Sequence, residues 1–331
     1  MAADERVTCG ELGSIAAFDR DDTEARQYWD DLSGKRLDPR LVRQARSEEM
    51  QEFRKHGVNV KVPIQRCWEE TGKDPIGVRW VDINKGDDVE PEYRSRLVAQ
   101  EIKVDKREDL FAATPPLEAK KMLFSLAATE KFEEDGTENR NKLDFIDVRR
   151  AYFHARARRD VYVKLPEEDA APGMCGKLNK AMYGTRDAAA NFQHEVKKFM
   201  QSIGFSVGIY NPSTYYHPHR NLKTFVHGDD FVTSGTSDQC KWLQKQLQRR
   251  FEIKTNFIDP SKGEQEERIL NRIIRANKDG WEIEADQRHV DLIIKQLNIQ
   301  NGVSTPAEES LKPADDDNVP LSEGQSSLYR Q

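Results

Sequence analysis

A short apolar segment interrupted by two adjacent carboxylates constrains this sequence more than any other feature. Residues 224–233 read TFVHGDDFVT, so two runs rich in Phe, Val and Thr flank Gly228, Asp229 and Asp230. Such residues favour β-strands, and a glycine next to an aspartate is a frequent hairpin turn. The segment therefore predicts two antiparallel strands whose turn presents both carboxylates to solvent. A turn of this kind makes a cation site.

Adjacent aspartates carry little information on their own in this chain. Further groups stand in polar or glycine-bearing stretches at residues 21–22, 30–31, 87–88 and 315–317. For these, a solvated loop is the expected structure, because runs of charge usually face water. The pair at 229–230 differs because strand-like apolar residues lie on both sides of it. Taken alone, even that hairpin is as consistent with a structural acidic turn as with a catalytic one.

A further carboxylate stands at the end of another predicted strand. Residues 143–148 read LDFIDV, and the two-residue period of a strand puts Asp147 at the point where this strand gives way to the next element. If the two strand ends converge, Asp147, Asp229 and Asp230 can hold two hard divalent cations about 3.5 to 4 Å apart, as polymerases do. The alternative for Asp147 is a helix cap.

Several short motifs follow one another in a fixed order. They are YRSRLVAQ at 93–100, DVRRAYF at 147–153, VYVKLP at 161–166, KLNKAMYG at 177–184, GDD at 228–230 and STP at 304–306. Together they resemble the reverse transcriptase domain of copia-type LTR retrotransposons, from about residue 38 to about residue 330. The chain departs from the family pattern where His227 and Gly228 replace Tyr-Val before the two aspartates. It also has an acid, Asp187, where an amide is usual.

The resemblance implies an α+β fold of the right-hand polymerase type, with fingers, a small thumb, and a palm whose antiparallel sheet is backed by helices. The expected regions are a poorly ordered acidic extension at 1–37, fingers and palm at 38–235, a thumb-like region at 236–300, and a flexible linker at 301–331 towards an absent connection and RNase H region. The two ends lack sustained apolar periodicity, and the last is rich in Pro, Ser, Asp and Glu.

Local patterns predict the elements around the site. Asp38 and Pro39 form a helix start, and residues 75–83 and 93–99 read as two strands of a fingers hairpin. A later helix is expected to cover the back of the palm sheet with an apolar stripe made of Phe192, Val196, Phe199 and Met200.

By resemblance, Asp147, Asp229 and Asp230 are the catalytic residues and the ligands of two Mg²⁺ ions, for which Mn²⁺ can substitute. One ion would activate the primer 3'-hydroxyl, and the other would neutralise charge on the departing pyrophosphate. The substrate-binding positions that the resemblance implies are Arg96, Lys85, Tyr152, Ala151, Arg186 and Gly184.

We expect a specific role for three of these positions. Arg96 and Lys85 are expected to clamp the triphosphate, since a guanidinium offers paired donors and an ammonium a point charge. For both, and more so for Lys85, the alternative is a solvated surface cation. Tyr152 is expected to lie under the ribose and exclude a 2'-hydroxyl, with a core aromatic as the alternative.

The implied function is RNA-directed DNA synthesis, with a primed RNA or DNA template and deoxynucleoside triphosphates as partners. Two alternatives stay open. The departures at His227, Gly228 and Asp187 also fit a decayed retroelement fragment that keeps the fold or only binds nucleic acid. The GDD turn also occurs in RNA-templated RNA polymerases. Other Pol segments, integrase and RNase H, are expected on separate or longer chains.

Composition adds weaker constraints. The net charge of −6 argues against a uniformly basic nucleic-acid binder, although a locally basic groove is sufficient for a polymerase. No secretory signal and no apolar run of about twenty residues is present, so no membrane partner is expected. The cysteines at 9, 67, 175 and 240 are scattered and predict free thiols. An intracellular location is expected, in a cytoplasmic particle or the nucleus.

Overall fold

The computed structural model describes most of the chain. The described residues are 26–102, 110–129, 141–259, 262–270, 272–277, 280–285, 287–302, 320, 322, 324 and 326. The chain divides into two compact units, Met1–Glu267 with Arg275–Glu282, and Arg268–Ile274 with Ile283–Gln331. The larger unit combines helices with antiparallel sheets, so the predicted α+β class is confirmed.

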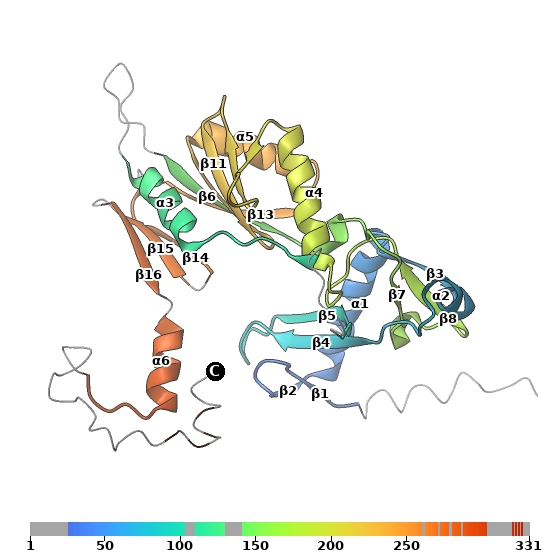
Figure 1. Ribbon diagram of the computed structural model, residues 1–331. Coiled ribbons are helices and arrows are strands. Elements are labelled where there is room, and N and C mark those ends of the chain that lie inside the picture. Colours follow the sequence, from blue (N-terminus) through green and yellow to red (C-terminus); the bar gives the residue numbers. More distant parts are fainter. Residues whose placement is uncertain are drawn as a thin grey trace, which may run out of the picture. The chain divides into compact units, whose positions relative to one another are not determined.

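A six-stranded antiparallel sheet forms the centre of the larger unit (Figure 1). In spatial order its strands are β13 (Ile253–Ile258), β6 (Lys142–Val148), β12 (Asp230–Gly235), β11 (Leu222–His227), β10 (Thr214–His217) and β9 (Ser206–Val207). The hairpin predicted at residues 224–233 is confirmed as β11 and β12. The strand predicted at 143–148 is β6, and it pairs directly with β12.

Helices cover both faces of this sheet. On one face lie α4 (Ala188–Ser202) and α5 (Ser237–Gln248), and on the other lies α3 (Leu117–Ala128). Phe192 of α4 and Leu243 of α5 share a buried core with Ile146 and Phe231 of the sheet. The prediction that the helix around Phe192 covers the sheet is therefore confirmed.

A second group of elements packs around α1 (Pro39–Lys55). It comprises the hairpin β4 (Val78–Asn84) and β5 (Tyr93–Ala99), the antiparallel sheet β3 (Asn59–Pro63), β8 (Met174–Leu178) and β7 (Tyr162–Val163), the helix α2 (Ile64–Thr71), and the 3-10 turns η2 (Ala151–His154) and η3 (Glu167–Asp169). The predicted start of α1 is confirmed, because Asp38 Oδ1 accepts the Arg40 backbone N–H at 2.7 Å.

Two expected boundaries differ from the structure. Residues 28–37, expected in the poorly ordered extension, form the short strands β1 (Tyr28–Trp29) and β2 (Arg36–Leu37). Between them, Asp30 is buried and accepts the Asn84 backbone N–H at 2.7 Å, so this acid is not the solvated loop residue that its sequence predicts. Strands of two residues are too short to produce a readable period. Residues 1–25 lie outside the described residues.

The boundary expected at residue 235 falls inside the central sheet layer. Beyond it, α5 packs on the sheet, and β13 pairs with β6 along its whole length. The chain then forms a three-stranded sheet and a final helix, β14 (Gln265–Ile269), β15 (Arg272–Asn277), β16 (Gly280–Ala285) and α6 (Gln287–Gln296). Most of the linker expected at 301–331 lies outside the described residues.

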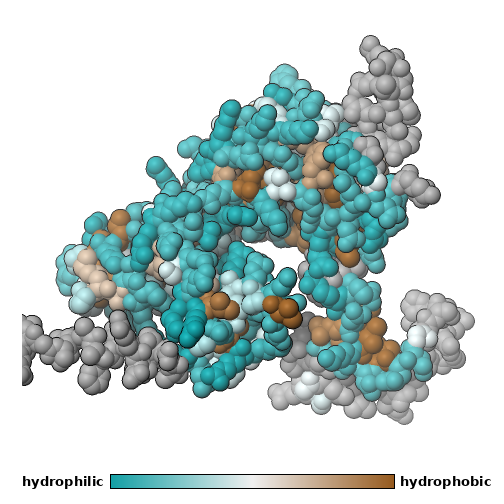
Figure 2. Space-filling view, turned by 180° about the vertical axis from the view of Figure 1, so that it is seen from behind, coloured by the Kyte–Doolittle hydropathy of each residue, from teal (hydrophilic) through white to brown (hydrophobic). Residues whose placement is uncertain are grey.

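The surface is mostly polar. The face in Figure 2 is largely hydrophilic, with apolar residues in small groups, which agrees with a sequence that is 33% charged. No helix within the described ranges has the length and apolar character of a bilayer span. Cys67, Cys175 and Cys240 are buried free thiols, as predicted.

Asp144 is a fully buried carboxyl between β6 and α5. Its Oδ1 accepts a hydrogen bond from Gln244 Nε2 at 2.9 Å, and its Oδ2 has no partner. Burial raises the pKa of Asp144 to about 7, so the folded chain holds this proton more tightly than the unfolded chain. Asp144 therefore makes folding less favourable as the pH rises from about 4 to about 7.

We expect Asp144→Asn to have little effect on stability near pH 4 and to raise the free energy of unfolding at pH 8 by roughly 1 to 4 kcal/mol, because Asn mimics the protonated acid. Urea unfolding at both pH values measures this difference. Asp238→Asn, at an exposed position in α5, is the control. A difference between wild type and Asp144→Asn that does not change with pH contradicts the argument.

Candidate functional site

The three predicted carboxylates lie at one end of the central sheet. Asp230 of β12 stands opposite Asp147 of β6, so the two side chains project from the same face of the sheet. Asp229 lies in the adjoining turn, and its backbone oxygen accepts the Val148 N–H at 3.0 Å. Gly228 has a φ of 63°, which a two-residue hairpin turn requires and glycine adopts without strain.

Cross-strand pairing extends this arrangement into a row of four side chains. Lys254 of β13 stands opposite Asp147, and His227 of β11 stands opposite Asp230. The sequence gives no sign of Lys254 as a site residue, because its place depends on the pairing of two strands that are about a hundred residues apart. The register of β13 with β6 puts the cationic residue Lys254 beside Asp147.

Burial and neighbouring negative charge raise the pKa values of Asp147 and Asp230. Burial and the negative charges of Asp229 and Asp147 raise the pKa of Asp230 to about 6. The pKa of Asp147 is also raised, first because the surrounding protein removes part of its water and then because of Asp229, while Arg94 acts against this. Acidic groups that repel one another in this way favour a bound cation. Their oxygen donors fit a hard divalent ion such as Mg²⁺.

The aspartate oxygens are not gathered around a single point. Among the described residues, one group of three potential metal ligands has all its ligand atoms within 4.8 Å of one another, and it is Glu52, His56 and Glu252. Three carboxylates that share an ion need oxygens within about 4 Å, given ligand distances near 2.1 Å. Binding of one ion by all three aspartates therefore requires their oxygens to move closer together.

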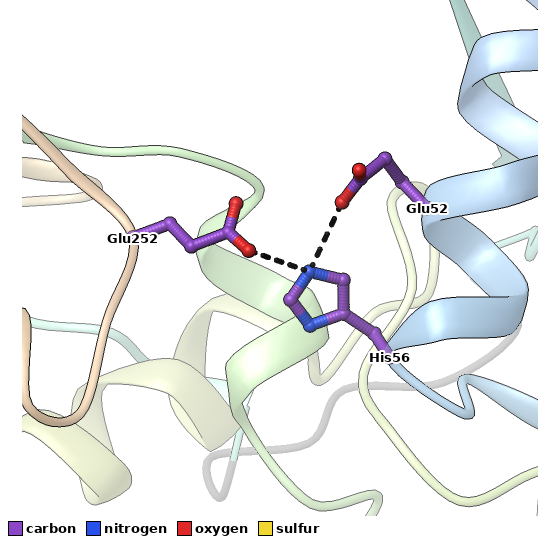
Figure 3. A group of neighbouring side chains, drawn as sticks. All are labelled: Glu52, His56 and Glu252. Atoms are coloured by element: carbon purple, nitrogen blue, oxygen red, sulfur yellow. Dashed lines mark ion pairs between the residues drawn. The ribbon is translucent and has the colours of Figure 1, made fainter.

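Glu52, His56 and Glu252 form an ion-pair cluster outside the aspartate site (Figure 3). The last turn of α1 supplies Glu52, His56 caps that helix, and Glu252 precedes β13. His56 Nε2 is 3.5 Å from Glu52 and 3.7 Å from Glu252. Lys55 Nζ lies 3.1 Å from Glu52 and 2.7 Å from Glu252, so a lysine already supplies the positive charge between the two acids. The cluster joins α1 to the strand beside β6.

Basic residues of the β4–β5 hairpin lie near the aspartates. Burial and the charges of Arg94 and Arg96 lower the pKa of Lys85, and the charge of Asp147 acts in the opposite direction. Lys85 therefore lies within electrostatic range of both Arg96 and Asp147. Arg94 was not predicted. The sequence could have identified Arg94, because it lies two residues before Arg96 in the same strand and residues two apart share a face.

A pair of tyrosines stands between the acidic and basic groups. The rings of Tyr152 and Tyr183 have centroids 4.8 Å apart, and the Arg96 guanidinium lies over the Tyr183 ring at 4.8 Å. Burial raises the pKa of both tyrosines, to about 12 for Tyr183, and the Asp229 charge raises both further. Tyr152 also packs on Phe192, as expected of a core aromatic. It nevertheless lies close to Asp229, where the ring predicted to contact the ribose is expected.

The other predicted substrate-binding residues make structural contacts. A β-carbon at Gly184 would lie 1.9 Å from the Ala99 backbone oxygen, so glycine lets this segment approach β5. Ala151 is only 2% exposed, so its side chain is turned into the core, and its place among the substrate-binding residues stays a prediction. The Arg186 backbone N–H donates to Glu101 Oε2 at 2.8 Å.

Asp187 is held in a buried ion-pair network. Its Oδ1 lies 2.8 Å from Arg159 Nη2, and its Oδ2 accepts from Asn191 Nδ2 at 2.9 Å. Burial raises the pKa of Asp187, but the hydrogen bond and charge of Arg159 outweigh it and hold the pKa below its ordinary value. The negative charge at this position therefore has its own local partner.

Two comparisons relate this chain to known proteins. The family model described as "Reverse transcriptase (RNA-dependent DNA polymerase)" matches residues 68–263, which is more than half of the chain. The "Retrovirus-related Pol polyprotein from transposon TNT 1-94" of Nicotiana tabacum is 24% identical over 283 residues, covering 81% of this chain. The match covers 20% of that protein, so the chain spans about a fifth of the relative's length.

The close contact at Gly184 can be tested against a glycine that has open space. Gly184 has a φ of 81°, and Gly72 after α2 has a φ of 65° with nothing within 4 Å of a β-carbon. Alanine at either position costs about 1 to 2 kcal/mol in the left-handed region. We expect Gly184→Ala to lower the free energy of unfolding by at least about 1 kcal/mol more than Gly72→Ala, because only it forces the chain away from β5. Urea unfolding of both variants measures this, and equal losses contradict it.

Proposed function

The chain belongs to the reverse transcriptase family and carries the reverse transcriptase domain of a copia-type retrotransposon Pol polyprotein, and from this premise we propose that it catalyses RNA-directed DNA synthesis. The reaction adds a deoxynucleotide to the 3'-hydroxyl of a primer on an RNA or DNA template. The observation that carries the proposal is the register of β6 with β12, which pairs Asp147 with Asp230 next to the turn that holds Asp229.

The elements fit the parts of a right-hand polymerase. The central sheet with α3, α4 and α5 corresponds to the palm. The elements around α1, including the β4–β5 hairpin, correspond to the fingers. The β14–β16 sheet and α6 are the remaining elements that a thumb can use. This assignment puts the three aspartates in the palm and the basic hairpin in the fingers.

The aspartates provide the donors for a divalent metal. Asp147, Asp229 and Asp230 would hold Mg²⁺, and their oxygens also suit Mn²⁺. When bound, the ions lower the proton affinity of the primer hydroxyl and neutralise charge on pyrophosphate. The repulsion that raises the pKa of Asp230 supports this role, because a cation relieves it.

The protein's own cations and rings act on the nucleotide. Arg96 can donate two parallel hydrogen bonds to phosphate oxygens, whereas Lys85 offers a point charge. Lys85 interacts electrostatically with both Arg96 and Asp147, which supports a triphosphate site beside the acids. Tyr152 is held by Tyr183 and Phe192, so its ring is fixed in one orientation from which it can exclude a ribose 2'-hydroxyl.

The central test is primer extension on a primed RNA template, with deoxy or ribo triphosphates and with Mg²⁺ or Mn²⁺. We expect deoxynucleotide extension that Asp229→Asn reduces by about 10² to 10³-fold or more, the loss typical when one electrostatic stabiliser is removed. Asp238→Asn, at an exposed site in α5, is the control and should extend normally.

Each other outcome has a defined meaning. Extension with ribonucleotides in place of deoxynucleotides supports an RNA-templated RNA polymerase. A folded wild-type protein that extends nothing supports a decayed fragment, for which the motivation is His227 and Gly228 before the two aspartates. Either result contradicts the proposal.

A second prediction concerns the choice of sugar. We expect Tyr152→Ala to incorporate ribonucleotides, because removal of the ring opens the space beside the sugar's 2' position. Tyr152→Phe keeps the ring and should retain the discrimination. The measurement is the ratio of deoxy to ribo incorporation under single-turnover conditions, with thermal unfolding as a check on folding. An active Tyr152→Ala enzyme with unchanged discrimination contradicts the assignment.

A further inference from the structure

A concave groove lies between the end of α1 and strand β8, apart from the predicted site residues. Its volume is about 630 Å³, and its lining includes Gly57, Arg156, Arg158, Asn179 and Lys180. None of its lining residues is a predicted catalytic or substrate-binding residue, and none is aromatic. Three of the four residues from 156 to 159 are arginines, a local density of positive charge within a chain whose net charge is −6.

Part of the positive charge in the groove is not neutralised locally. Arg156 and Arg158 are exposed, and within the described ranges neither they nor Lys180 form an ion pair. Arg159 differs, because Glu101 lies 2.6 Å and Asp187 lies 2.8 Å from its Nη2. The arginines at 156 and 158 are therefore available to an external anion.

The balance of charge in the groove is positive. Asp160, the acidic residue in the lining, lies 2.9 Å from Lys177 Nζ. Arg156 and Lys180 are fixed beside each other by a backbone bridge. Burial lowers the pKa of Lys180, and repulsion from the charges of Arg250 and Arg156 lowers it further, while Glu195 acts in the opposite direction. A bound anion would relieve this repulsion.

We propose that this groove binds the phosphate backbone of a nucleic acid strand outside the carboxylate site. One guanidinium group can donate two parallel hydrogen bonds to phosphate oxygens. The exposed amide of Asn179 can add a further donor. Without aromatic rings to stack on bases, the groove recognises the charge and spacing of phosphates and not the sequence. The proposed function enters only in the choice of nucleic acid as the polyanion.

The test measures binding of a single-stranded RNA oligonucleotide by fluorescence anisotropy at several KCl concentrations. Each phosphate contact to a single strand contributes about 0.7 to the slope of log affinity against log salt. The double variant Arg156→Glu, Arg158→Glu should therefore lower the slope by about 1.4. If the plots of log affinity against log salt for the wild type and the double variant meet near 1 M salt, this change corresponds to about a 25-fold loss of affinity at 0.1 M.

The control double variant is Arg36→Glu, Arg40→Glu. It makes the same change in net charge at exposed positions next to the start of α1, whereas the groove lies at the end of that helix. We expect it to keep the wild-type slope. A wild-type slope in the groove variant overturns the proposal, and so does an equal loss in both double variants.

Failure of the groove can be distinguished from failure of the polymerase assignment. Asp229→Asn changes the carboxylate site and should keep the wild-type salt slope. A loss of slope in Asp229→Asn equal to that of the groove variant would show that the RNA contacts lie at the carboxylates, and this also overturns the proposal. Primer extension tests chemistry at the carboxylate site, whereas the salt slope tests phosphate contacts in the groove.

Discussion

The antiparallel pairing of β6 with β12 is the constraint on which the candidate site depends. A shift of one residue in this register would send Asp230 to the face of the sheet opposite Asp147. The register is held by apolar neighbours in the same strands, because Ile146 and Phe231 stand opposite each other and are buried beneath α4 and α5. Core packing thus holds together carboxylates that repel one another, and the raised pKa of Asp230 reflects first its burial and then that repulsion.

The acids of α1 determine which arginines remain available near the site. Arg150 follows the end of β6, but its Nε donates to the buried Glu49 at 3.1 Å. Burial raises the pKa of Glu49, and the charge of Arg150 opposes this, so each partner depends on the other. Arg150 is therefore held against α1, whereas Arg96 lies on the Tyr183 ring. The local pairing of Asp187 similarly keeps that acid from opposing a phosphate.

Short-range patterns in the sequence predicted the parts of this site, and long-range pairing determined its composition. The hairpin turn, the end of β6 and the start of α1 each depend on neighbouring residues, so their sequences were sufficient. Lys254 reaches the site through the pairing of β13 with β6, which no local pattern specifies. The burial of the Ala151 side chain could not be predicted, because a motif gives the order of residues but not which side chains face the core. The role of the three aspartates stays a prediction.

The net charge of −6 conceals a separation of charge into regions of opposite sign. The end of the central sheet concentrates carboxylates, so an anionic nucleotide can approach it only with cations, from a bound metal or from residues such as Arg96. The groove at Arg156 and Arg158 has the opposite balance and needs no metal to attract phosphate. The net charge cannot reveal this separation, because it does not depend on where each charged residue lies in the structure. The two surfaces therefore differ in their demand for divalent ions, and metal removal should separate the proposed catalysis at one from the proposed phosphate binding at the other.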